Sequence, residues 1–152
     1  MRALAIVRIV VAAGIIAGAV ALAEWGGLRG EPQLVIKAVY DQAGGLPRGA
    51  LDGLAVAAPL VLLLTVARLI RRNRTAPAQI LSLAGALAPL TGVVAAAFDL
   101  VGLLNEVLAA HSAPPPMAGP RLAEAALVLG LGLLVGGLAT LPRGAGWNGG
   151  EP

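Results

Sequence analysis

The chain has 152 residues, of which 58% are apolar and 12% are charged, and its formal net charge is +3. This charged share is roughly half that of an average soluble domain, and a small soluble protein could not keep so apolar a surface in water. The composition therefore excludes an ordinary soluble domain and favours a protein embedded in lipid. The chain contains no cysteine, which excludes disulfides, thiolate metal sites and cysteine nucleophiles.

Four segments are apolar enough to cross a bilayer as helices, which takes about 20 residues. In chain order they are residues 3–23, 51–70, 80–104 and 122–141. The sequence thus predicts an all-α, multi-pass membrane helical bundle in one domain, residues 1–143. A Gly-rich tail, residues 144–152, is expected to be disordered. The first segment has an alternative interpretation as a cleaved signal peptide, because Ala21-Leu22-Ala23 fits a small-x-small cleavage site.

The basic residues predict the orientation of the bundle, because links rich in Arg and Lys stay in the cytoplasm. One side of the predicted membrane carries Arg2, Arg8, Arg68, Arg71, Arg72, Arg74 and Arg143. The other side carries Arg29, Lys37, Arg48 and Arg121. We therefore expect both termini in the cytoplasm, with the net charge contacting anionic lipid. A basic patch interleaved with aromatic residues is absent from the sequence, which argues against nucleic-acid binding.

The two connections expected on the outer side have different patterns. Between the first two spans, the chain predicts one short helix lying on the outer interface, formed by Leu34, Val35, Ile36, Val39 and Tyr40. Trp25 and Tyr40 suit that interface, since their rings are apolar with a polar tip. Between the last two spans, Pro114-Pro115-Pro116 predicts an extended outer loop over about residues 111–120.

Small residues mark the helix faces that we expect to pack closely. Helices in lipid associate where small side chains let their backbones approach. The first span has Gly14 and Gly18 at this spacing, and the fourth has Gly132 and Gly136. The third span has the longest stripe, on one helical face: Gly85, Ala88, Gly92, Ala96 and Asp99. This face should pack against another helix or another copy, and Pro89 should bend the span.

Asp99 and Glu124 are the candidate residues of a proton path. A carboxylate inside a span is costly and by default indicates an ion or proton path. For Asp99 the alternative is that the third span ends earlier and leaves it near the outer headgroups. For Glu124 the alternative is a structural ion pair with Arg121, three residues before it. Glu106 is expected to be a solvated charge at a helix end, and His111 a solvated loop residue.

The sequence contains little that would support catalysis or cofactor binding. One histidine and no cysteine make a transition-metal site improbable. The serines and threonines of the spans have no accompanying base, so nucleophilic catalysis has no visible machinery. We therefore expect neither an enzyme nor a cofactor. A small transporter would need several polar groups at mid-depth, and the spans offer few.

Two runs around the last two spans resemble a known family. Ala88-Pro89-Leu90-Thr91-Gly92 lies in the third span, and Pro120-Arg121-Leu122-Ala123-Glu124-Ala125-Ala126 enters the fourth. Together they resemble the paired signatures of the MotA/TolQ/ExbB family of proton-channel subunits, and the resemblance covers about residues 81–143. Pro89 and Glu124 match family positions. Ala96 and Leu129 fall where channel-type members often have pore threonines, so the chain departs from the pattern there.

The resemblance implies a stator-like subunit of the bacterial inner (cytoplasmic) membrane. Such subunits form rings of five around a pair of single-span partners, and the partner supplies an essential intramembrane aspartate. Proton flow through the ring then drives work. In the family a large cytoplasmic segment precedes the channel hairpin, whereas this chain has only residues 71–79 there. The alternative function is a non-conducting scaffold or assembly subunit of a larger membrane complex.

Overall fold

The structure is a computed structural model that describes residues 2–28, 30–71, 78–110 and 115–142. Within these ranges the regular elements are helices: α1 (Arg2–Trp25), α2 (Pro32–Gln42), α3 (Gly45–Arg71), α4 (Ala78–Ala110) and α5 (Pro115–Thr140). Of these, α1, α3, α4 and α5 are long and apolar enough to cross a membrane. The predicted all-α, multi-pass bundle is confirmed. The orientation of the termini stays a prediction, and the predicted tail lies outside the described residues.

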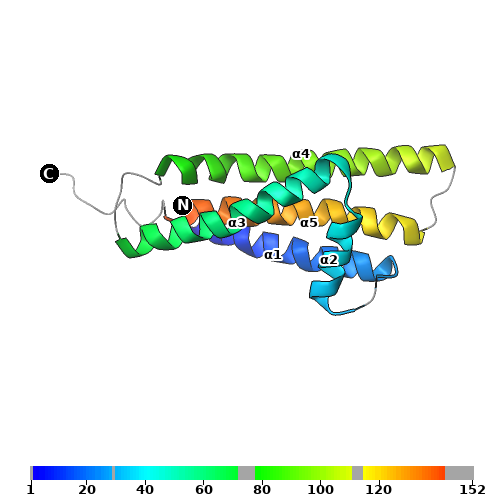
Figure 1. Cartoon of the computed structure of the whole chain (residues 1–152), viewed down its shortest axis with the longest axis horizontal. Helices are drawn as coiled ribbons and strands as arrows, with labels where there is room; N and C mark the ends of the chain where they lie inside the picture. Colours follow the sequence, from blue (N-terminus) through cyan, green and yellow to red (C-terminus); the bar gives the residue numbers. More distant parts are fainter. Residues whose placement is uncertain (1, 29, 72–77, 111–114, 143–152) are drawn as a thin grey trace.

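Helix α5 occupies the middle of the bundle and packs against α1, α3 and α4 (Figure 1). The starts of α1 and α4 lie at the same end of the bundle as the ends of α3 and α5. The four long helices therefore alternate in direction along the chain. The end of the bundle that holds the start of α5 is called the outer end below, following the predicted orientation.

Helix α1 ends in a turn that needs a glycine. The Gly27 N–H donates to the Glu24 carbonyl, and the Leu28 N–H donates to the Ala23 carbonyl. These two bonds form a Schellman motif, which satisfies carbonyls that the helix end leaves free. Gly27 has φ +96°, a left-handed conformation that glycine adopts without strain. The turn sends the chain back across the outer end of the bundle.

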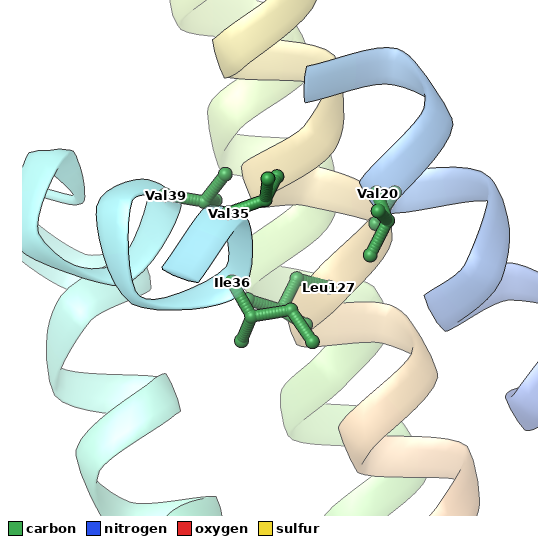
Figure 2. Close-up of a pocket in the computed structure, with 6 residues that line it drawn as sticks. Val20, Val35, Ile36, Val39 and Leu127 are labelled. Carbon is green, nitrogen blue, oxygen red and sulfur yellow. The ribbon is translucent and has the colours of Figure 1, made fainter. Parts of the chain in front are cut away.

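The short helix predicted in the first connection is α2, and it runs crosswise to the long helices (Figure 1). Val35 and Val39 are buried on its inner face. Figure 2 shows them, with Ile36, facing Val20 of α1 and Leu127 of α5. Helix α2 thus rests on α1 and α5 through apolar side chains. A turn at Gly45, with φ +61°, then starts α3.

Glycines bring the backbones of α4 and α5 into direct contact. A Cβ atom at Gly132 would lie 2.6 Å from the Ala88 carbonyl oxygen and 3.0 Å from the Gly92 Cα atom. A Cβ atom at Gly92 would lie 3.0 Å from the Val128 carbonyl oxygen. One turn towards the other end, Gly136 lies against the ring of Pro89. All three positions require glycine, because the space that a side chain would need is filled by backbone atoms at Gly132 and Gly92 and by the Pro89 ring at Gly136.

The third-span stripe accounts for one side of this contact. Gly85, Ala88, Gly92, Ala96 and Asp99 are all buried in the bundle. The contacts of Gly85 and Gly92 are with residues of α5. The partner of this stripe in the structure is therefore another helix of the same chain.

Helix α1 approaches the opposite side of α5 in the same way. A Cβ atom at Gly119 would lie 2.7 Å from the Gly26 Cα atom, and one at Gly130 would lie 2.6 Å from a side-chain carbon of Ile16. Gly14 and Gly18 of α1 have no neighbouring atom within 4 Å of their Cβ positions. Within the described ranges, the contact expected for that pair is not made. The α1 face that meets α5 instead carries Ala5, Ala12, Ala19 and Ala23, which are all buried.

The proline-rich part of the last connection differs from the sequence prediction. We expected an extended loop over about residues 111–120, but α5 already begins at Pro115. Proline is well tolerated in the first turn of a helix, since its missing N–H would have no partner there and its φ is already close to helical. The expected loop is therefore much shorter, and residues 111–114, which include His111, lie outside the described ranges.

Substituting Gly132 by alanine should destabilise the bundle. The new methyl group would meet the Ala88 carbonyl oxygen, so α4 and α5 would have to separate, and overpacking of this kind typically costs about 1–3 kcal/mol. The measurement is thermal unfolding of the purified protein in a mild detergent. The matched control is Gly102→Ala in α4, because Gly102 has nothing within 4 Å. Equal stability of both variants would contradict the described α4–α5 contact.

Candidate functional site

Two carboxyl groups lie inside the bundle near its outer end. Asp99 of α4 is 2% exposed, and Glu124 of α5 is 4% exposed. Each lies on a glycine-lined face, since Gly92 is seven residues before Asp99 and Gly132 is eight residues after Glu124. The two side chains are close enough to interact electrostatically. Sequence spacing predicted that Asp99 points at a packing interface, but it did not predict that Glu124 lies across that interface from it.

The α4 helix continues about three turns beyond Asp99, to Ala110. The helix itself thus does not end at Asp99, and whether Asp99 lies within the hydrocarbon or near the outer headgroups stays a prediction. The protein buries Asp99 by packing α4 against α5, irrespective of the depth of the lipid headgroups. The same contact buries Glu124.

The buried carboxyl groups are only partly satisfied by hydrogen bonds. Asp99 Oδ2 and Glu124 Oε1 are buried and have no hydrogen-bond partner. The backbone N–H of Gly44, just before the first residue of α3, acts on the Glu124 carboxyl group. The start of a helix carries a partial positive charge, which favours a carboxylate nearby. The pair therefore has some electrostatic support but retains free acceptor oxygens in an apolar interior.

Arg121 is placed differently from the sequence prediction. The i, i+3 spacing suggested an ion pair with Glu124, but the Arg121 guanidinium donates to Glu106 of α4 at 2.8 Å. Their side chains are 43% and 57% exposed. This ion pair bridges α4 and α5 close to the buried pair, and Arg121 acts electrostatically on both Asp99 and Glu124. Glu106 is thus exposed, as expected, but it is also paired.

The α2–α3 corner next to Gly44 is held by polar side chains. The Tyr40 hydroxyl donates to Asp52, and the Arg48 guanidinium lies 5.0 Å from the centre of the Tyr40 ring. The hydrogen bond to Asp52 raises the pKa of Tyr40 above its usual value, since it is made only by the neutral hydroxyl. These contacts join α2 to α3 on either side of Gly44.

The arrangement suits a proton better than a metal ion. A hard cation is usually held by six or more oxygen ligands, or by fewer together with several waters. Within the described residues there is no group of three or more His, Cys, Asp or Glu side chains that could hold a metal. The neighbours of the carboxyl pair include a cation, Arg121, and an N–H donor, Gly44, and both of these disfavour a second cation. A carboxyl oxygen without a partner can instead take a proton.

Polar side chains become sparse between this pair and the other end of the bundle. Thr65 of α3 donates to the Leu138 carbonyl at 3.1 Å, and Thr140 donates to the Gly136 and Gly137 carbonyls of its own helix. Thr140 lies about 24 Å along α5 from Glu124. The intervening α4–α5 contact is made by Gly92, Val128 and Gly132. The inside of the described chain thus offers no continuous row of polar side chains from end to end.

Ala96 and Leu129 occupy positions that the family resemblance associates with pore threonines. Ala96 is buried, and Leu129 is partly buried against the same core. Neither carries a hydroxyl group. Pro89 lies within α4, with its ring against Gly136. The first of the two runs that carry the resemblance, residues 88–92, therefore lies at the close contact of α4 with α5.

The sequence analysis did not predict Gly44 or the Arg121–Glu106 pair as parts of the site. The first could not be found from side chains, because a backbone N–H makes the contact. The second joins residues 15 apart on two helices, and only the register of α4 against α5 brings them together. The antiparallel hairpin was predictable, but its register was not.

No protein-family model, curated protein or solved structure matches the chain.

Proposed function

We propose that the protein is a stator-like proton-channel subunit, in which the Asp99–Glu124 pair takes up and releases a proton. The single observation that carries this proposal is the burial of two neighbouring carboxyl groups with unpartnered oxygens inside membrane-spanning helices. Ionised carboxylates buried without partners are very costly, so such groups favour carrying a proton. The pair lies near the outer end of the bundle, where Arg121 acts on both carboxyl groups.

The scarcity of polar side chains inside the described bundle supports a function in which a second protein or another copy completes the proton path. A proton on Asp99 or Glu124 has no row of polar side chains to follow through the chain towards Thr65 and Thr140. The second half of a path would have to run along the surface of the bundle, between copies or beside another protein. We therefore propose a homo-oligomer that works with a single-span partner carrying an intramembrane aspartate, in the bacterial inner membrane with both termini in the cytoplasm.

A second candidate function is a non-conducting scaffold or assembly subunit of a larger membrane complex. The observation that favours it is the direct backbone contact of α5 with α4 and α1, which makes a rigid and apolar centre. In that case the carboxyl pair would have a structural role. Contacts with further subunits would form on the outward faces of α1, α3 and α4.

Replacing Asp99 by Asn, or Glu124 by Gln, should lower the proton leak of membrane vesicles that contain the protein. Each change removes a protonatable group and keeps its shape, so most of the protein-dependent leak should be lost while insertion is unchanged. The measurement is the decay of an imposed pH gradient, followed with an entrapped dye. The control is Asp41→Asn, which alters an exposed acid of α2. An undiminished leak in both site variants would remove these carboxyl groups from the mechanism.

The native mass of the purified protein separates the two candidate functions. Five copies of the 15.1 kDa chain in a mild detergent are expected for the stator-like subunit. A monomer, or a species that appears only together with other subunits, would favour the scaffold. The measurement is light scattering on the eluted peak with the detergent contribution subtracted, and the intact-chain mass recorded alongside shows whether residues 1–23 are retained.

A further inference from the structure

Arg121 interacts with three carboxyl groups at the outer end of the bundle. Arg121 donates to Glu106 in the structure, and it also acts electrostatically on Asp99 and Glu124. The three acids differ in their surroundings, because Glu106 is exposed whereas the other two are buried. Among them, only the buried acids have oxygens that are inaccessible to water and without a hydrogen-bond partner. Arg121 is thus paired with the exposed acid, whose charge water already stabilises, and not with either buried acid.

The positions of these residues let Arg121 reach either partner. Glu124 follows Arg121 by three residues, which places both on one face of α5. Glu106 follows Asp99 by seven residues, which places both on one face of α4 about 10 Å apart along the axis. The guanidinium group donates to the exposed acid at 2.8 Å and acts electrostatically on both buried acids. A long arginine side chain can move between such positions by changing rotamers, without a movement of either helix.

The energetics of the two positions depend on the protonation of the buried pair. An ion pair at the surface contributes little to stability, so Arg121 loses little when it leaves Glu106. A neutral carboxyl group attracts the guanidinium weakly, whereas a buried ionised carboxylate attracts it strongly. The preferred partner of Arg121 should therefore switch when a buried carboxyl group loses its proton.

We propose that Arg121 is a movable counter-ion, which pairs with Glu106 while the Asp99–Glu124 pair holds a proton and turns to that pair when the proton leaves. This proposal rests on the proposed function of the pair in proton uptake and release. In the exchange one carboxyl O–H bond breaks, and the proton passes to water at the outer end. The guanidinium stays protonated throughout and exchanges one carboxylate acceptor for another. Arg121 is a positioning residue whose location determines the pH at which the pair releases its proton.

Among the residues that the structure describes, the other charged groups near this end contact one another or lie on the surface. Arg48 and Asp52 contact Tyr40 at the α2–α3 corner. Glu24, at the end of α1, is exposed. The groups that act on the buried pair from the helices packed around it are Arg121 and the Gly44 N–H. The protonation of the pair should thus respond to changes at Arg121 and at its partner Glu106.

Two variants that break the same ion pair should have opposite effects. Arg121→Gln removes the counter-ion, so more of the buried pair should hold its proton. Glu106→Gln frees Arg121 to stay with the buried pair, so less of it should hold its proton. The measurement is the infrared band of neutral carboxyl groups for the protein in lipid bilayers, counting only the part that Asp99→Asn and Glu124→Gln together remove. The comparison is made at the pH where the wild type retains half of that band.

At that pH we expect the neutral carboxyl band of the pair to be nearly absent in E106Q. In R121Q we expect it to be close to its full intensity. Arg121→Lys keeps the charge and should stay closer to the wild type than R121Q, and Glu24→Gln should leave the band unchanged. If Arg121 and Glu106 only fasten α4 to α5, both variants will change the band in the same direction, or not at all, and the proposal is wrong. If R121Q does not fold, E106Q and R121K still test the proposal. A neutral carboxyl band in E106Q as strong as that of the wild type would then show that the proposal is wrong.

These outcomes are separate from a failure of the proposed function. A proton leak that survives Asp99→Asn and Glu124→Gln would overturn the function of the pair, whatever Arg121 does. A leak that depends on the pair, together with equal bands in R121Q and E106Q, would overturn only the movable counter-ion.

Discussion

The direct contact of helix backbones around α5 is the constraint on which the rest of the structure depends. Gly132 and Gly92 let α5 meet α4, and Gly119 and Gly26 let it meet α1, at distances that leave no space for a side chain. Helix α5 is about as apolar as the other three long helices. It is the central helix because its glycines allow this close approach on two sides. Dispersion contacts and close backbone approach hold such helices together, since lipid gives them no hydrophobic reason to associate.

The same packing gives the carboxyl groups their chemistry. Asp99 and Glu124 lie on the glycine-lined faces, so the contact that closes the bundle also removes both side chains from water and lipid. Their remaining support comes from the Gly44 N–H, which precedes the start of a helix, and from the positive charge of Arg121. A buried acid pair with weak support and one nearby cation can change its protonation with little rearrangement. A fully satisfied network would resist that change.

Composition and periodicity were enough to predict the four spans, the short helix α2 and the faces that carry small residues. They indicate which residues share a helical face, but they do not indicate which neighbour that face meets. The Gly14–Gly18 pair and the Gly132–Gly136 pair have the same spacing, yet the first faces outward and the second meets α4. Pro114-Pro115-Pro116 suggested a loop because proline disfavours helix interiors, but the start of a helix accepts it. Arg121 has acids at two reachable positions, and only the register of α4 against α5 selects Glu106.

The proposed function requires that Asp99 and Glu124 hold a proton inside the bundle at neutral pH. Infrared spectra can test this, measured in lipid bilayers on the wild-type protein and on a variant with both Asp99→Asn and Glu124→Gln. If the pair holds a proton, the wild type will have a neutral carboxyl band at neutral pH that moves in heavy water and is missing from the double variant. Identical spectra of the two proteins in this region would show that both groups are ionised, and the proposed function of the pair would be wrong.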